Sequence, residues 1–148
     1  MKKIFLFCIC VVLYIAIMYT VSSTQTYERV MLDASGDFYE VTTAETEAFS
    51  VELHINNESN LAVSSQLEDC ISYSIYRVHD GEEAYLGKNI LADSIGNILP
   101  DTSKTVICGV YIPPEKGTYK LVFDIDRGDS FCLSSKGMDA LEINVEVK

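Results

Sequence analysis

Three cysteines outside the apolar N-terminus are the residues best placed for covalent chemistry: Cys70, Cys108 and Cys132. Three thiols allow one disulfide and leave one over. Cys70 falls on the polar side of an alternating stretch, Cys108 falls on the apolar side of another, and Cys132 follows the expected neighbour of the Cys70 stretch. We therefore predict a Cys70–Cys132 disulfide with Cys108 free and buried. The alternative is three reduced thiols.

A second candidate site is the tripeptide Arg127-Gly128-Asp129, which lies between two apolar stretches and is predicted to form a loop. Integrin-binding fibronectin-type domains present the same tripeptide in a loop, so these residues are a candidate contact. The alternative is an ordinary Gly-Asp turn. Asp124 and Asp126 lie just before it, but a calcium ion needs 6–8 oxygen ligands and the spacing of an EF-hand is missing. We expect solvated loop acids and no metal.

Other residue types that support catalysis are sparse. His54 and His79 are the only histidines. Neither lies beside a recognisable nucleophile motif, and no glycine-rich phosphate loop is present. No Cys-x-x-Cys pair or Cys/His cluster indicates zinc. The sequence predicts a protein that is not an enzyme and holds no cofactor.

The elements that position these residues are predicted to be strands. Apolar residues recur at every second position, which is the period of a strand with one buried face. This alternation covers residues 49–55, 71–75, 106–112, 119–125 and 141–147. Clusters of Asn, Asp, Gly and Pro separate these stretches. About seven short strands of this kind predict an all-β fold, an immunoglobulin-like antiparallel β-sandwich.

The N-terminus differs in composition from the rest of the chain. Lys2 and Lys3 precede a charge-free apolar run from Ile4 to Val21. This run is long for a signal peptide and close to the lower limit for a membrane-spanning helix. We predict one hydrophobic helix in residues 1–22, an uncleaved transmembrane anchor with a cleaved signal peptide as the alternative. Residues 23–36 are predicted to be a linker, with a first edge strand at their short apolar island, Val30–Leu32, as the alternative. Residues 37–148 are predicted to be the sandwich, exported and either membrane-anchored or secreted.

The net charge excludes one class of partner. Without residues 1–23 the chain carries 9 basic and 22 acidic side chains, a net charge of −13. Nucleic acids and anionic lipid headgroups are bound through clustered Lys and Arg. We therefore expect no nucleic-acid partner, and contact with a membrane only through the N-terminal segment.

The segment Ile98–Phe123 has a Leu–Pro turn, a strand ending in Pro113-Pro114, and a Pro-x-x-Gly-x-Tyr motif that ends at Tyr119. It resembles the second half of an immunoglobulin-like domain found beside bacterial cell-surface glycosyltransferases and in other exported bacterial proteins. Three further segments resemble parts of that family: Val51–Asn57, Ser72–Gly81 and Phe131–Gly137. The family often has a tryptophan near the last of these, and this chain has none.

Tyr119 opens the sixth predicted strand. A tyrosine at this place can donate its hydroxyl hydrogen to the backbone upstream, which forms a tyrosine corner. Two residues later, where an antibody domain has cysteine, this chain has Leu121. Apolar packing must therefore hold the two sheets together.

Together these patterns favour a non-enzymatic, exported and membrane-tethered interaction module that binds a protein or a glycan at the bacterial cell envelope. One alternative is an extracellular protease inhibitor acting through an exposed loop, and another is a small carboxylate-dependent hydrolase. The candidate aromatic contacts are Tyr73, Tyr76, Tyr85 and Tyr111.

Overall fold

The computed structural model describes residues 9–16, 27–47, 49–91 and 95–148. In this part of the chain the strands are β1 (Val30–Ala34), β2 (Phe38–Val41), β3 (Ser50–Asn57), β4 (Val63–Ser64), β5 (Asp69–His79), β6 (Glu82–Leu91), β7 (Asn97–Ile98), β8 (Thr102–Gly109), β9 (Gly117–Arg127), β10 (Phe131–Cys132) and β11 (Leu141–Val147). Two short 3-10 helices, η1 (Ser65–Leu67) and η2 (Leu133–Lys136), follow β4 and β10.

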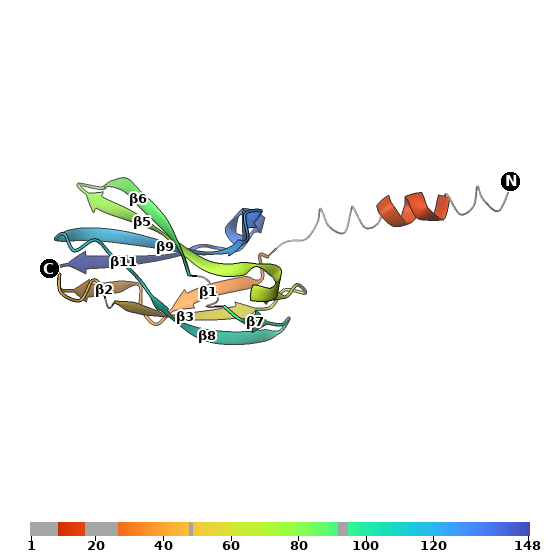
Figure 1. The fold of residues 1–148 in the computed structure, drawn as a ribbon, viewed down its shortest axis with the longest axis horizontal. Helices are drawn as coiled ribbons and strands as arrows, with labels where there is room; N and C mark the ends of the chain where they lie inside the picture. The colour runs from red at the N-terminus through yellow and green to blue at the C-terminus, as the bar shows by residue number, and fades with distance from the viewer. Residues whose placement is uncertain (1–8, 17–26, 48, 92–94) are drawn as a thin grey trace.

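Two main sheets face each other (Figure 1). The larger sheet has the strand order β2-β11-β9-β5-β6, with β10 also paired to β9, and the smaller has the order β1-β3-β8. The first two strands are divided between the sheets: β1 pairs antiparallel with β3, and β2 pairs parallel with β11. This division and this order make an immunoglobulin-like β-sandwich. The predicted fold class is confirmed.

The core lies between the sheets and follows the predicted alternation. Val51, Leu53 and Ile55 of β3 face Leu121 and other inward residues of β9, and all are fully buried. Cys108 is buried among them as a small apolar residue, as predicted. The two sheets are therefore held together by close-packed side chains.

The predicted boundary between linker and domain is wrong. Residues 23–36 were expected to be a linker, but Tyr27 is buried in the core and β1 lies within this segment. Val30 and Leu32 of β1 point inward while Met31 is exposed. The short apolar island at residues 30–32 is thus a strand, because it continues the smaller sheet beside β3.

The N-terminal segment is described only in part. Residues 9–16 form a helix, and residues 1–8 and 17–26 lie outside the described residues. Among the residues that are described, no helix is both long enough and apolar enough to cross a bilayer. The predicted anchor or signal peptide at residues 1–22 therefore stays a prediction.

Tyr119 makes the contact expected of a tyrosine corner. Its hydroxyl donates to the backbone carbonyl of Glu115, four residues upstream, at 2.9 Å. The side chain is fully buried, and burial raises the pKa of this phenol above its usual value. The bond joins the loop before β9 to the start of that strand.

We predict that Tyr119→Phe lowers the free energy of unfolding by about 1–3 kcal/mol, because the Glu115 carbonyl loses its donor. Urea denaturation followed by circular dichroism measures the change. Tyr85→Phe, on an exposed ring of β6, is the matched control and should be neutral. Equal stability of Tyr119→Phe and the parent protein would contradict a structural role for this bond.

Candidate functional site

The surface of interest is the outer face of the larger sheet, which we define by the residues of β5, β6 and β9 that point away from the core. They are Cys70, Ser72, Ser74, Tyr76, Glu83, Tyr85, Lys88, Ile90, Lys120, Val122, Asp124 and Asp126. In β5 and β9 they alternate with core residues, as strand geometry requires. The outer face of β5 and β9 therefore carries the mostly polar residues that alternate with the core residues.

A β-bulge decides which side chains of β6 reach this face. Ile75 pairs with Gly87, but the next residue of β5, Tyr76, pairs with Tyr85. Leu86 is thus the extra residue, and a bulge of this kind changes which face the following residues point to. Because of it, Lys88 and Ile90 lie on the same face as Tyr85.

One end of the outer face is hollowed into a depression of about 300 Å³. Its lining includes Lys88 and Ile90 of β6, Asp126 of β9, and Phe131 and Cys132 of β10. The Lys88 ammonium forms an ion pair with Asp126, with 2.5 Å between Nζ and Oδ2. Burial alone would lower the pKa of Lys88, but the hydrogen bond to Asp126 and the attraction of nearby negative charges together outweigh it, so the pKa is raised.

Asp126 is only half satisfied. Its side chain is 9% exposed, and its second oxygen, Oδ1, has no hydrogen-bond partner among the described residues. The same holds for the buried hydroxyl of Ser72. A buried polar group left without a partner costs about 1–3 kcal/mol. Asp126 therefore brings an incompletely hydrogen-bonded carboxylate to the lining of the depression.

The acids near this depression differ from the prediction of solvated loop residues. Asp124 and Asp126 belong to β9, and only Asp129 lies in a turn. Asp124 accepts hydrogen bonds from the backbone N–H and the hydroxyl of Ser134. Within the described residues no group of three or more His, Cys, Asp or Glu side chains could hold a metal ion.

The predicted Cys70–Cys132 disulfide is not formed, and both thiols are free. Cys70 and Cys132 each pair in register with Asp126, one from β5 and the other from β10. They lie on opposite sides of β9, so two strand spacings, about 9–10 Å, separate their Cα atoms. A disulfide needs less than about 7 Å. The prediction failed because β10 folds back onto the edge of β9 that faces away from β5.

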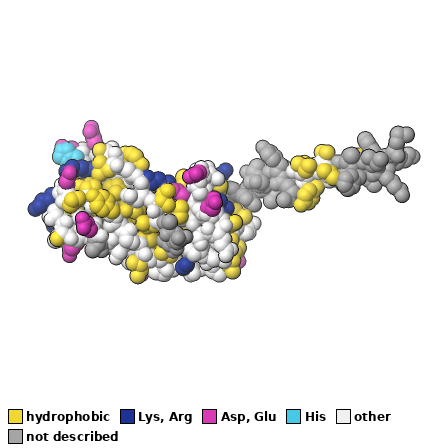
Figure 2. All heavy atoms as spheres, in the orientation of Figure 1, with side chains coloured by type: hydrophobic (Ala, Val, Ile, Leu, Met, Phe, Trp, Pro, Cys, Tyr) yellow, Lys and Arg dark blue, Asp and Glu magenta, His cyan; other side chains and the backbone are white. Residues whose placement is uncertain are grey.

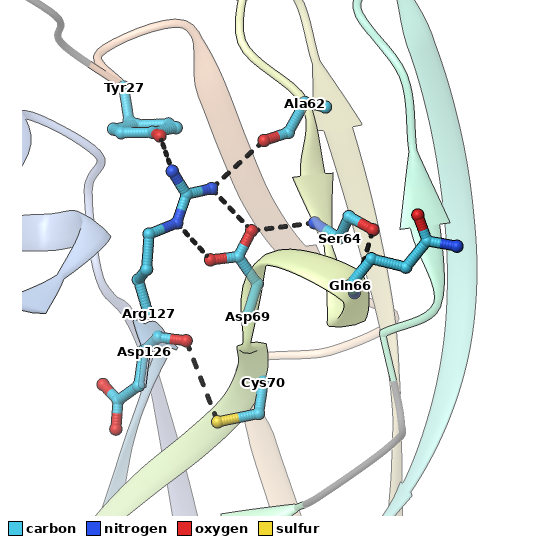
Figure 3. A network of polar contacts seen from close by, with 8 residues as sticks. All are labelled: Tyr27, Ala62, Ser64, Gln66, Asp69, Cys70, Asp126 and Arg127. Atoms are coloured by element: carbon cyan, nitrogen blue, oxygen red, sulfur yellow. Dashed lines mark hydrogen bonds and ion pairs between the residues drawn. The ribbon is translucent and has the colours of Figure 1, made fainter. Parts of the chain in front are cut away.

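Arg127 does not lie in a loop, as the tripeptide suggested, but ends β9 and points inward (Figure 3). Its guanidinium holds both carboxylate oxygens of Asp69, at 2.6 and 2.7 Å. It also donates to the Tyr27 hydroxyl at 2.5 Å and to the Ala62 carbonyl at 3.2 Å. Ser64 donates its backbone N–H to Asp69 at 2.8 Å. Arg127 is therefore committed to the fold and is not free for a partner.

Gly128 and Asp129 form the turn after β9. Gly128 has φ of +51°, which favours glycine, and its N–H donates to the Glu68 carbonyl at 3.0 Å. A Cβ here would lie 2.6 Å from the Glu68 carboxylate. These contacts support the ordinary turn over a presented recognition loop.

The other end of the outer face is aromatic. The rings of Tyr76 and Tyr85 pack with centroids 5.4 Å apart, and the Lys120 ammonium lies 5.4 Å from the Tyr76 ring. Lys120 also pairs with Glu83 at 2.6 Å. Tyr85 is 59% exposed and Ile90 is 61% exposed. Figure 2 shows hydrophobic side chains gathered where Figure 1 places β5 and β6.

The remaining predicted aromatic contacts divide in two. Tyr111 is exposed, whereas Tyr73 is a core residue whose hydroxyl accepts the backbone N–H of Tyr111 at 2.9 Å. Tyr73 is therefore unavailable to a partner.

Sequence reasoning also missed the Lys88–Asp126 pair. In the sequence, the only indication of this pair was Asp126, an acid in a strand pattern, and no residue near it indicated Lys88 as its partner.

No family model matches the sequence, and no curated protein matches it significantly. Among solved structures, the chain is similar to the CARDB domain of a Pyrococcus furiosus protein, crystallised in complex with di-metal ions. The identity is 15%, the alignment covers 83% of this chain and 97% of that one, and the TM-score is 0.41.

The solution structure of the same CARDB domain gives 15% identity, 80% and 91% coverage, and a TM-score of 0.42. The class 5 fimbriae chaperone CfaA gives 12% identity, 77% and 54% coverage, and a TM-score of 0.37. Similarities this distant transfer no ligand, partner or activity. The strand order of the chain itself defines it as an immunoglobulin-like sandwich module.

We predict that iodoacetamide at pH 8 alkylates Cys70 and Cys132 in the folded protein, and Cys108 only after denaturation. Burial raises the pKa of Cys108 to about 11, so its thiol stays protonated and shielded at this pH. Mass spectrometry of digests from folded and denatured samples measures the labelling. A Cys70–Cys132 linked peptide in the non-reduced digest would contradict this arrangement.

We predict that Asp69→Ala destabilises the protein by about 3–5 kcal/mol, because it leaves the Arg127 guanidinium largely buried without its counter-ion. Chemical denaturation measures the loss. Arg29→Ala is the control: it removes an ion pair with Glu58 in which both side chains are exposed, and it should cost less than about 1 kcal/mol. Similar losses in the two variants would refute the importance of the buried pair.

Proposed function

We propose that the protein is a non-enzymatic interaction module, exported and tethered on the outer side of a bacterial membrane, which binds a protein or a glycan of the cell envelope. The outer face of the larger sheet is its binding surface. The observation that carries this proposal is the exposure of apolar side chains on β6, an edge strand of ten residues.

Edge strands that stay soluble are normally short, charged or covered. β6 is long, and Tyr85, Leu86 and Ile90 are all exposed on it. Its bulge and Lys88 discourage unspecific pairing, but they leave this apolar surface in place. Clustered exposed apolar side chains with a polar rim are typical of interaction sites.

The tethered location is supported by the sequence. An apolar run behind Lys2 and Lys3 is suited to export or anchoring, and the resemblance of residues 98–123 is to domains of exported bacterial proteins. After residue 23 the chain carries 9 basic and 22 acidic side chains, a balance that would not draw it onto anionic lipid. A tether would then bring the binding face to the envelope without lipid contact by the sandwich itself.

A photo-crosslinking residue placed at position 85 of the full chain tests the proposal in intact bacterial cells. We expect a crosslinked adduct in the envelope fraction. The matched control is the same residue at position 107, because Ile107 is 71% exposed on β8, an edge strand of the smaller sheet. Adducts of equal yield at both positions, or none at position 85, would refute this binding face.

A further inference from the structure

The depression is lined by a donor, Lys88, that is partly exposed and by the carboxylate of Asp126, which is incompletely hydrogen-bonded. Asp126 Oδ1 is a buried acceptor without a partner among the described residues. An ammonium has three N–H donors, and Asp126 Oδ2 takes one of those of Lys88, whose side chain is 39% exposed. One ion pair thus offers an acceptor and donors to the same small space.

Charge limits what can satisfy both groups. A cationic ligand would satisfy Asp126 but would be repelled by Lys88. An anionic ligand would satisfy Lys88 but would meet the negative charges of Asp126, of Asp129 in the same lining, and of Asp124 nearby. A neutral ligand avoids both penalties, provided that it donates and accepts hydrogen bonds at adjacent atoms.

Adjacent hydroxyl groups meet this requirement, because each hydroxyl both donates and accepts. The wall fits the rest of such a molecule: Ile90, which is 61% exposed, presents apolar surface to the depression, against which the C–H face of a sugar ring can pack. The volume of about 300 Å³ is sufficient for a sugar ring.

We infer that this depression binds a neutral saccharide unit, with one hydroxyl donating to the Asp126 carboxylate and a neighbouring oxygen accepting from Lys88 Nζ. The inference rests on the proposed function and names the partner class for the depression within the same outer face. The Lys88–Asp126 pair orients the sugar, and Ile90 excludes water from one side of it.

The test measures binding of the full chain to an array of neutral, anionic and amino-sugar oligosaccharides, followed by isothermal titration calorimetry with the best neutral ligand. We expect saturable binding of neutral oligosaccharides. Asp126→Asn and Lys88→Gln should each weaken it at least tenfold. Glu40→Gln is the matched control, because it breaks an exposed lysine–carboxylate pair with Lys148 that lies outside the residues defining the outer face, and it should leave binding unchanged.

Thermal melting identifies any variant that fails to fold. If Asp126→Asn does not fold, Lys88→Gln still tests the inference, because the Lys88 side chain is partly exposed. Binding only of charged sugars, no binding of any neutral sugar, or neutral-sugar binding that Lys88→Gln leaves intact would each overturn the inference. A crosslinked adduct at position 85 without saccharide binding would refute the inference alone and leave the proposed binding face standing.

Discussion

The buried pair of Arg127 and Asp69 is the contact on which the arrangement of the domain most depends. The two residues face each other directly across β9 and β5, so their bidentate bond fixes the register of the two strands at the centre of the larger sheet. The other hydrogen bonds of these two side chains are formed with Tyr27, Ala62 and Ser64. One ion pair therefore joins the start of the domain, the loop around β4 and the central strands, and closes the end of the core with polar groups that are all bonded.

The outer face inherits its chemistry from this register. Neighbouring residues of β9 point to opposite faces, so fixing Arg127 inward sends Asp126 outward, away from the cluster, as Figure 3 shows. The bulge in β6 then lets Lys88 reach it. Both carboxylate oxygens of Asp69, the counter-ion of Arg127, are hydrogen-bonded, whereas one oxygen of Asp126 has no partner in the part of the chain that the structure describes. The end of β9 thus carries Arg127, whose ion pair is part of the fold, on one face, and Asp126, whose carboxylate is incompletely hydrogen-bonded, on the other.

The features of this structure that depend on neighbouring residues could be predicted from the sequence, whereas those that depend on residues far apart in the chain could not. Period-two alternation is local, so it correctly identified the strands that carry Val51, Cys108 and Tyr119. The pairing of strands is not local. Arg127 and Asp69 are 58 residues apart, and no pattern near either residue indicates the other. The tripeptide suggested a loop because its glycine and aspartate do form a turn, while the arginine before them belongs to the strand.

The fold of β10 was unpredictable for a similar reason. A two-residue strand has no periodicity, so the edge of β9 that receives it depends on the turn geometry at Gly128 and on the hydrogen bonds of Ser134. The candidate disulfide depended on that choice of edge. The candidate site likewise became visible only when three strands brought Lys88, Asp126 and Cys132 together.

The position of Tyr27 has a mechanical consequence. Its backbone N–H donates to the Lys136 carbonyl, its ring lies 5.3 Å from the Arg127 guanidinium, and its hydroxyl is bound by the same group. A pull on the chain before Tyr27 is therefore transmitted through Arg127 to β9 and β5 before β1 can be peeled from β3. Resistance to forced unfolding depends on the rate at which such contacts break. A module held by its N-terminus would thus carry load through the middle of its larger sheet, and the edge strand of the smaller sheet would be spared.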